Sequence, residues 1–242
     1  MISLDKAIVI IPTFNEISNI EKMLETLHQL HPTLNVLIID DGSPDGTADV
    51  IKRFQQKKSN LHLIERQGKL GLGTAYIRGF RWALEKKFEA VITMDCDFSH
   101  DPEAIPTFTN NIGKYDLVVG SRYIGGICIM NWPMQRLLLS YFASIYARTI
   151  TGIPFSDSTG GFNCYSYKAL SSINLDKIFS IGYAFQIELK YKIWSLGLPS
   201  MENPITFFER TVGKSKMSRK IIIEAVINVF RLRVKKTLGT LQ

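Results

Sequence analysis

The sequence predicts an α/β protein with a doubly wound, mostly parallel sheet flanked by helices, followed by a C-terminal amphipathic helix. Short apolar runs recur through the first half of the chain without the polar alternation of a half-exposed strand, which is typical of parallel strands buried on both faces. Segments with helical periodicity separate these runs, so strands and helices alternate over five strands. In such sheets ligands bind beyond the carboxyl ends of the strands, and polar residues gather there in this chain.

The expected elements follow in order along the chain. The five strands are residues 7–11, 36–40, 61–64, 90–94 and 116–120, and the helices between them are residues 16–30, 47–58, 74–87 and 102–112. Beyond residue 123 the alternation stops, and we expect a helix at 135–151, a glycine-rich turn at 157–162, a helix at 183–196 and a strand at 200–207. No Pro-rich or Ser-rich linker interrupts this stretch, so residues 1–217 are predicted to form a single domain, with a helix at 218–242 after it.

The composition indicates a globular protein of a reducing compartment. The chain has 242 residues, of which 45% are hydrophobic and 21% charged, and this excludes the disordered class. Cys96, Cys128 and Cys164 form neither an even disulfide framework nor a CxxC zinc pair, which favours the cytoplasm. The first apolar run is too short for a signal peptide, and the most apolar long window, residues 137–155, contains Arg148 and is a poor membrane span. We therefore expect no exported leader and no transmembrane helix.

The net charge of +7 is concentrated at the C-terminal end. Residues 210–242 contain nine basic side chains and one acidic one, whereas residues 1–209 have a net charge of −1. On a helix this segment is amphipathic, with Lys220, Arg231 and Lys235 opposite an apolar face. That face consists of Ile222, Ile223, Val226, Ile227, Val229, Phe230 and Val234. Such a helix either packs on the core with a solvated basic face or lies on an anionic membrane surface, whereas nucleic acid is not expected because no known motif accompanies the basic residues.

Two carboxylates follow the fourth expected strand. Asp95 and Asp97 have i, i+2 spacing, which directs both to one side, and two hard oxygen donors there suit Mg²⁺ or Mn²⁺ bridging phosphates. Acidic residues after strands are also common turn formers and helix caps, so the pattern alone leaves both interpretations open. Ser99 and His100 extend the cluster or begin the next helix.

Two further strand ends have polar loops with weak signals of their own. Asp40 and Asp41 end the second strand, where a carboxylate commonly accepts from ribose hydroxyls or a base N–H, and Asp41 is the better candidate for a ligand contact. The glycines of residues 71–76 let the backbone approach a diphosphate at a helix N-terminus. These glycines match neither the GxGxxG spacing of a dinucleotide site nor the GK[ST] of a P-loop.

Taken together, these strings are far more specific than any one of them. PTFNE at 12–16, IDDGSPDGT at 39–47, GLGTAY at 71–76, MDCDFSHDP at 94–102, GSRY at 120–123, NWP at 131–133, DSTGGF at 157–162, GYAFQ at 182–186 and FERTVGKSK at 208–216 occur in this order. In combination the chain resembles the polyprenol (dolichyl) phosphate mannose synthases, inverting family 2 glycosyltransferases with the Rossmann-like GT-A fold. The resemblance extends to about Lys216.

The resemblance implies transfer of mannose from GDP-mannose to a polyprenyl phosphate, with a Mg²⁺ or Mn²⁺ ion. It implies that residues 1–123 hold the nucleotide sugar, that residues 124–217 hold the acceptor, and that the helix at 218–242 meets a membrane surface. The residues implied for the nucleotide sugar are Pro12, Phe14, Glu16, Ile39, Asp41, Asp95, Cys96, Asp97, Arg122, Arg210 and Lys216. Those implied for the metal are Asp95, Asp97 and Ser99, those for the acceptor phosphate are Arg122, Arg136 and Arg210, and those for catalysis are Asp97, Arg122, Arg210 and Lys216.

The implied acceptor also bears on the mechanism. A lipid phosphate is already an anionic nucleophile near neutral pH, so no strong general base is required. Asp157 lies in the turn where other family 2 enzymes keep a base, and we interpret it either as orienting an arginine or a sugar hydroxyl or as a structural turn residue.

Several alternatives remain open on the sequence. Transfer of glucose or N-acetylglucosamine to a lipid phosphate would use much of the same scaffold. A phosphatase of the haloacid dehalogenase type expects its DxD motif on the first strand rather than the fourth, and a non-enzymatic basic module leaves the carboxylates at the strand ends unexplained. We expect peripheral association with the cytoplasmic face of a membrane, with or without an anchoring partner subunit.

Overall fold

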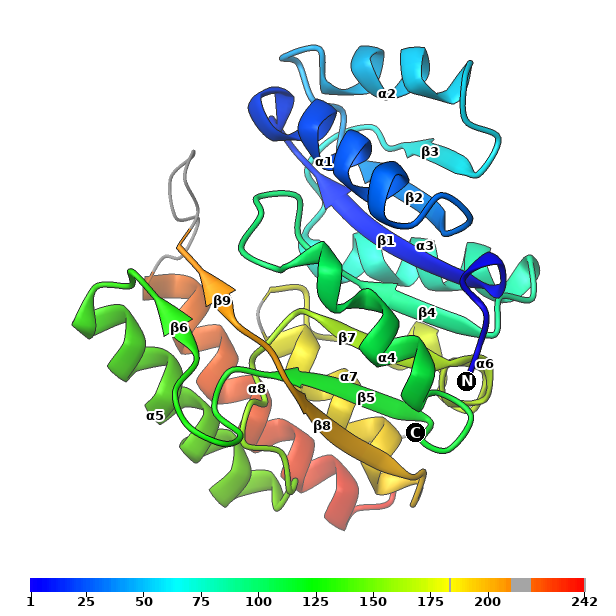
Figure 1. Ribbon diagram of the computed structural model, residues 1–242. Coiled ribbons are helices and arrows are strands. Elements are labelled where there is room, and N and C mark those ends of the chain that lie inside the picture. Colours follow the sequence, from blue (N-terminus) through cyan, green and yellow to red (C-terminus); the bar gives the residue numbers. More distant parts are fainter. Residues whose placement is uncertain (183, 210–218, 242) are drawn as a thin grey trace.

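A seven-stranded sheet forms the centre of the computed structural model, which describes residues 1–182, 184–209 and 219–241, with side chains for all of these except 219–222 (Figure 1). The strand order is β3-β2-β1-β4-β7-β5-β8, and every neighbouring pair is parallel except those that involve β7. The strands are β1 (Ala7–Thr13), β2 (Asn35–Asp40), β3 (Leu61–Glu65), β4 (Ala90–Thr93), β5 (Leu117–Ser121), β7 (Asn163–Ser166) and β8 (Ser200–Pro204). A small second sheet pairs β6 (Ile129–Met130) with β9 (Phe207–Phe208).

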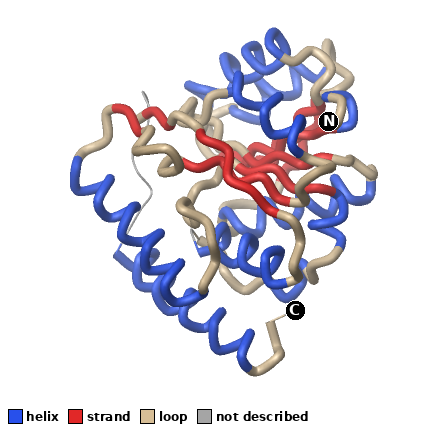
Figure 2. Tube along the Cα trace, turned by 60° about the horizontal axis from the view of Figure 1, so that its bottom comes forward, coloured by secondary structure: helices blue, strands red, loops and turns tan. Residues whose placement is uncertain are grey.

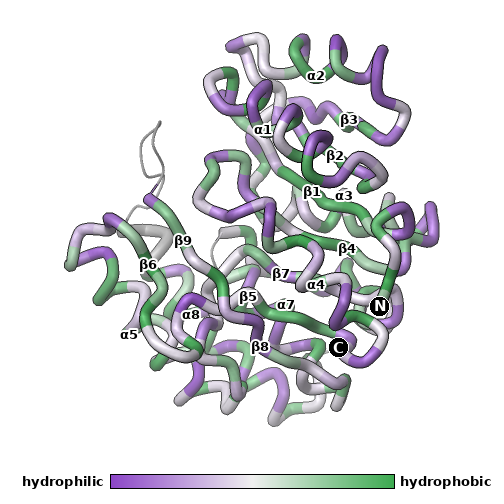
Figure 3. Tube along the Cα trace, viewed as in Figure 1, coloured by the Kyte–Doolittle hydropathy of each residue, from purple (hydrophilic) through white to green (hydrophobic). Residues whose placement is uncertain are grey.

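Helices lie on both sides of the strands, as Figure 2 shows. They are α1 (Ile17–Leu30), α2 (Thr47–Gln55), α3 (Leu72–Glu85), α4 (Ile105–Asn111), α5 (Met134–Thr151), α6 (Tyr167–Ser171), α7 (Ala184–Ser195) and α8 (Arg219–Thr237), with short 3-10 turns at Leu4–Lys6, Pro102–Ala104 and Leu175–Lys177. Two hydrophobic cores form, and residues of β1 alternate between them. The hydropathy colouring of Figure 3 shows β1, β4 and β5 as apolar, in keeping with burial on both faces.

The predicted fold class is confirmed, and its five strands are found within a few residues of their expected bounds. The expected strand at 200–207 is two strands, β8 and β9, with a break after Pro204. The largest difference is β7, which the sequence did not indicate. This strand is antiparallel and separates β4 from β5, which simple alternation would have made neighbours.

The position of β7 determines where the preceding glycine-rich turn lies. Asn163, the first residue of β7, pairs with Thr93 of β4 and with Val119 of β5. The turn before Asn163 therefore lies at the carboxyl ends of both parallel strands. It is thereby brought next to Asp95, which follows β4, and Arg122, which follows β5.

The C-terminal helix α8 packs against α5 and α7 beside the sheet (Figure 1). Val229 and Leu232 are buried, but most of the predicted apolar face is exposed to solvent. The exposed members are Ile223, Val226, Ile227, Phe230 and Val234, whereas the side chains of Lys220 and Ile222 lie outside the described set. Arg231 and Lys235 lie over the ring of Phe179, and Lys236 lies over Trp194. The basic side thus faces the domain in part, which neither simple interpretation of the sequence anticipated. Among the described residues, no helix is both long enough and apolar enough to cross a bilayer.

Candidate active site

Two cavities of about 350 Å³ each lie beyond the carboxyl ends of the parallel strands, and they meet at Asp95 and Asp97. The β1 cavity lies at the ends of β1 and β2 and at the start of α3, and the α5 cavity lies between the sheet, α5 and α8. The two carboxylates and Leu72 line both. A molecule in either cavity would therefore contact the same acidic pair.

Most of the residues predicted for the nucleotide sugar line the β1 cavity. They are Pro12, Phe14, Glu16, Asp41, Asp95, Cys96 and Asp97. Ile39 instead has its side chain fully buried in the core, and Arg122 lines the α5 cavity. Arg210 and Lys216 lie outside the described residues. Lys69, whose ammonium group lies 5.1 Å from the centre of the Phe14 ring, and Glu224 of α8 also line this cavity and were not predicted.

Asp41 is fixed at the end of β2 by a neighbouring arginine. Nε of Arg66 donates to Oδ1 of Asp41 at 2.7 Å, and Nη1 of Arg66 donates to Thr74 of α3 at 2.8 Å. Burial raises the pKa of Asp41, and the hydrogen bond from Arg66 offsets only part of that effect. Asp40 instead accepts hydrogen bonds from Thr13 and Ser43, so it stabilises the strand end.

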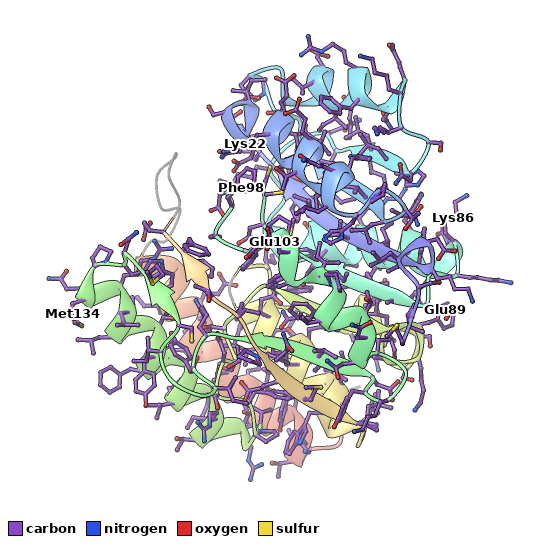
Figure 4. All side chains as sticks on the ribbon, in the orientation of Figure 1. Lys22, Lys86, Glu89, Phe98, Glu103 and Met134 are labelled. Atoms are coloured by element: carbon purple, nitrogen blue, oxygen red, sulfur yellow. The ribbon has the colours of Figure 1, made fainter. Side chains whose placement is uncertain are left out.

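The loop after β4 is held in an uncommon conformation. Phe98 has a φ of 59°, which a bulky residue rarely adopts, and Lys22 of α1 lies over its ring at 5.3 Å (Figure 4). Ser99 donates both its hydroxyl and its N–H to Oδ1 of Asp97. Nδ1 of His100 accepts from the N–H of Asp95, and burial lowers the pKa of His100 to about 4, so this ring is neutral with its proton on Nε2. These contacts fix the carboxylate of Asp97 and the backbone of Asp95 at the edge of the cavities.

The donor set suits a divalent cation that shares its coordination with a phosphate ligand. Asp95 and Asp97 present oxygen atoms at the boundary between two open cavities. Within the described part of the chain, no group of three or more Asp, Glu, His or Cys side chains is placed to hold a metal by itself. Mg²⁺ and Mn²⁺ are commonly bound by one or two carboxylates, with water and phosphate oxygens completing the shell, so the residues present fit such an ion.

Arg122 is the buried cation of the α5 cavity and is paired with Asp157. Its Nε and Nη2 donate to the two carboxylate oxygens of Asp157 at 2.6 and 2.8 Å, and Nη2 also donates to Thr159 at 2.9 Å. Burial alone would raise the pKa of Asp157, but the charge and hydrogen bonds of Arg122 outweigh it and lower that pKa to about 2. Asp157 therefore orients an arginine, and it also accepts from the N–H of Gly160 within its own turn, so each of its two sequence-based interpretations describes part of what it does. The rings of Trp132 and Phe207 lie 5.5 and 5.4 Å from the guanidinium carbon.

Arg136, near the start of α5, lines the same cavity. Its Nη1 donates to both carboxylate oxygens of Glu209 at 2.6 and 2.8 Å, and its guanidinium carbon lies 4.0 Å from the centre of the Trp132 ring. The ion pair is only partly exposed. Arg136 thus links α5 to the end of β9.

The α5 cavity also contains unsatisfied hydrogen-bond donors. Nε1 of Trp132, Nε of Arg136 and Nε2 of Gln186 are buried and have no hydrogen-bond partner among the residues that the structure describes. The amide of Gln186 is oriented by Asn163, which donates to Oε1 of Gln186 at 3.2 Å. Buried donors normally find acceptors, so this cluster favours a ligand rich in acceptor oxygens. The sequence indicated Trp132 and Gln186 only as parts of short strings, without a role.

The rest of the α5 cavity is apolar. Leu139, Phe142 and Ala143 of α5 line it, with Val226 and Val229 of α8 opposite. Leu139, Phe142 and Val226 are also exposed at the surface. The cavity is thus continuous with the exposed apolar sides of both helices.

Comparison with known proteins identifies relatives over most of the chain. The profile of glycosyl transferase family 2 matches residues 8–173. An undecaprenyl-phosphate mannosyltransferase of Micrococcus luteus is 42% identical over 226 residues, which are 93% of this chain and 93% of that protein. A polyprenol monophosphomannose synthase of Mycolicibacterium smegmatis is 38% identical over 93% of this chain and 85% of its own length.

Solved structures show the same fold. Glucosyl-3-phosphoglycerate synthase of Mycobacterium tuberculosis, in complex with Mn²⁺, uridine diphosphate and glucosyl-3-phosphoglycerate, superposes with a TM-score of 0.65 and 18% identity over 94% of this chain and 79% of that one. The complex with Mn²⁺ and UDP-glucose has a TM-score of 0.66 and 19% identity, over 94% of this chain and 78% of that one. At this identity the likeness concerns the GT-A-like fold alone.

The Arg122–Asp157 pair should give the protein a measurable acid sensitivity. Because the pKa of Asp157 is lowered in the folded state, its ionised form stabilises the fold above about pH 4, and this contribution is lost as the pH falls toward 2. Asp157→Asn leaves Arg122 buried without its partner, which should cost about 3–5 kcal/mol near neutral pH. Urea denaturation should show that the difference in free energy of unfolding between wild type and variant becomes smaller from pH 4 to pH 2. A difference that stays constant over that range would contradict the assignment.

Proposed function

The chain belongs to glycosyl transferase family 2, and we propose that it transfers mannose from GDP-mannose to a polyprenyl phosphate with inversion at the anomeric carbon. The observation that carries the proposal is the pair of cavities that meet at Asp95 and Asp97, of which one is lined by Phe14, Asp41 and Lys69 and the other by two arginines and an apolar wall. The names of the two mannosyl-transferring relatives support the choice of sugar and acceptor.

The β1 cavity would hold the nucleotide sugar. Phe14 and Lys69 would contact the nucleoside, and Asp41, fixed by Arg66, would accept hydrogen bonds from the ribose or the base. The diphosphate would then lie toward Asp95 and Asp97, at the boundary with the second cavity. Pro12, Glu16 and Cys96 would form part of the wall around the nucleotide sugar, whereas Ile39 lies in the core and would not contact it.

The α5 cavity would hold the lipid phosphate. Arg122 and Arg136 supply guanidinium N–H groups, and the donors on Trp132, Arg136 and Gln186 that lack a partner among the described residues would find acceptors in the phosphate oxygens. The apolar wall from α5 and α8 would take the first part of the prenyl chain. A nucleic-acid backbone would not explain this apolar wall.

The reaction is a single displacement. An anionic phosphate oxygen of the acceptor forms a bond to C1 of mannose as the bond from C1 to the diphosphate oxygen breaks, and GDP leaves with that electron pair. Arg122 and Arg136 orient the nucleophile. Asp95 and Asp97 would hold a Mg²⁺ or Mn²⁺ ion, which would supply positive charge to the leaving diphosphate. Ser99 orients Asp97 by hydrogen bonding, and we assign Arg210 and Lys216 to the same leaving-group charge on the resemblance alone.

Direct assay tests the proposal. Purified protein incubated with labelled GDP-mannose, Mn²⁺ and a short polyprenyl phosphate should give a labelled lipid phosphate sugar. Asp97→Asn should reduce turnover at least 100-fold without unfolding the protein, because one carboxylate of the divalent site is lost while the core is unchanged. Circular dichroism checks the fold. Turnover from UDP-glucose but not from GDP-mannose would overturn the choice of sugar, and near-normal turnover by folded Asp97→Asn would remove Asp97 from the mechanism.

Arg136→Ala should raise the KM for the lipid phosphate about tenfold or more and leave the KM for GDP-mannose nearly unchanged, because Arg136 lines only the α5 cavity. Steady-state kinetics with each substrate varied in turn makes the measurement. Arg148→Ala is the matched control, since Arg148 is exposed on the same helix. An effect confined to the donor KM would refute the assignment.

A membrane surface is the expected site of action. Exposed apolar side chains cover the outer sides of α5 and α8, the two helices whose inner sides line the acceptor cavity. On α5 they are Met134, which lies at its outer end in Figure 4, Leu138, Leu139, Tyr141, Phe142 and Ile145. Together with the exposed residues of α8 they form a surface that we call the α5/α8 surface. An apolar patch of this kind, flanked by basic residues, is typical of interfacial helices.

Vesicle flotation should show that this attachment is mainly hydrophobic. Ile227→Ser with Phe230→Ser should lower partition onto anionic vesicles at least tenfold, because each buried apolar side chain contributes about 1.5–3 kcal/mol. High salt should weaken binding of the wild type without abolishing it, since Arg231, Lys235 and Lys236 lie partly over aromatic rings. Leu30→Ser, on the far side, is the control. Unchanged partition of the double variant would exclude the α5/α8 surface.

A further inference from the structure

A fully buried lysine lies behind the acceptor cavity with no carboxylate partner of its own. Lys190 of α7 has no exposed surface, and its Nζ donates to the backbone carbonyls of Asp157, Ser158 and Gly160 at 3.1, 3.2 and 2.8 Å. Among the described residues it forms no ion pair, because the carboxylate of Asp157 is taken by Arg122. Lysine is almost never fully buried unless it is paired, so its presence here calls for a role.

The turn between Lys190 and the cavity is polarised by these contacts. Its carbonyls point to Lys190, and the chain has no cis peptide among the described residues, so the N–H groups that follow those carbonyls point to the opposite side. These are the N–H groups of Ser158, Thr159 and Gly161. Thr159, Gly160 and Gly161 line the α5 cavity, whereas Lys190 does not. Of these donors, the N–H groups of Thr159 and Gly161 belong to residues of the cavity wall, so the turn presents donors on the side away from Lys190.

The charge of Lys190 also matters for an anionic ligand. The Arg122–Asp157 pair is neutral as a unit, so by itself it attracts a phosphate only weakly. Lys190 adds one positive charge to this buried group. The other charged group near it is Glu202 of β8, which accepts from the N–H of Asp157 and is partly exposed, so solvent screens it more.

We propose that Lys190 is a positioning residue for the acceptor phosphate, which holds the 157–161 turn with its N–H groups toward the α5 cavity and supplies the positive charge that the Arg122–Asp157 pair cancels. The proposal rests on the proposed function in taking a lipid phosphate as the ligand. Lys190 would act on the phosphate without touching it, through the backbone of the turn that lies between them.

The pH dependence of phosphate binding gives a signature of this role. Burial lowers the pKa of Lys190 to about 8, and although Asp157 opposes the shift, Arg122 adds to it. The ammonium group is therefore mostly present at pH 7 and mostly lost at pH 9.5. A lipid monophosphate has its own second ionisation near pH 6, so it does not titrate in this range. Affinity for the acceptor should accordingly fall between pH 7 and pH 9.5.

The experiment measures binding of a short polyprenyl monophosphate by calorimetry, independently of sugar transfer. For the wild type, Kd should rise about tenfold from pH 7 to pH 9.5. Lys190→Gln, which keeps a donor without the charge, should show the weaker affinity already at pH 7 and no further loss at pH 9.5. The KM for GDP-mannose should stay unchanged.

Lys192→Gln provides the matched control. Lys192 is also fully buried on α7, but it donates to the carbonyl of Leu241, away from both cavities. This variant should keep the wild-type affinity and its pH dependence. Equal affinity of Lys190→Gln and wild type at pH 7, or a wild-type Kd that does not change to pH 9.5, would overturn the role of Lys190. Binding that depends on Lys190 in a protein that transfers no mannose would instead uphold this role and refute the proposed function.

Discussion

The ion pair between Arg122 and Asp157 is the constraint on which the site depends. It joins the end of β5 to the turn before β7, and both groups are buried, so their charges must be matched by close contacts. Asp157 also accepts from the N–H groups of Arg122 and Gly160. A carboxylate that accepts this many hydrogen bonds fixes both segments, and the cavity wall takes its shape from that fixation.

The remaining parts of the site are organised around the boundary between the two cavities. Asp95 and Asp97 are oriented by a loop in which Phe98 has a left-handed backbone and His100 supports the N–H of Asp95. That conformation is compensated by contacts from α1, through Lys22, and from Phe162, whose ring stacks on His100 with centroids 5.0 Å apart. Strain held in place by packing is common where side chains must meet a ligand at a fixed position.

The sequence predicted most of the fold but less of the site. The parallel strands were evident because residues such as Val91 and Val118 lie in mostly apolar runs, whereas β7 was missed because polar Asn163 and Ser166 leave only two apolar residues between them. Asn163 and Ser166 are buried because β7 lies between β4 and β5, and a local sequence pattern does not predict that position. The cavity residues at strand ends were found because they follow directly on these strands in the sequence. Contacts made across the fold, such as Lys190 on the 157–161 turn and Glu209 on Arg136, have no local signal.

The outward apolar side of α8 is a similar case. A helical projection places Val229 and Phe230 on one apolar face, and burial of that face against the core would have been the usual outcome. In the structure Val229 is buried and Phe230 is exposed, because α5 and α7 contact only part of the face. A membrane surface, as proposed above, would cover the apolar side chains of α8 that remain exposed.

The protonation states around the α5 cavity bear on the kind of acceptor that the site can use. Asp157 is ionised, but its oxygens are engaged by Arg122, and Nδ1 of His100 is occupied by a backbone N–H. Neither group is placed to take a proton from a hydroxyl nucleophile, for which a general base would be needed. A phosphate monoester needs none, since its attacking oxygen is already anionic. Under the proposed function, the buried donors and arginines would favour this anionic nucleophile over a neutral alcohol, and the apolar wall beside them would favour a phosphate that carries a hydrocarbon chain.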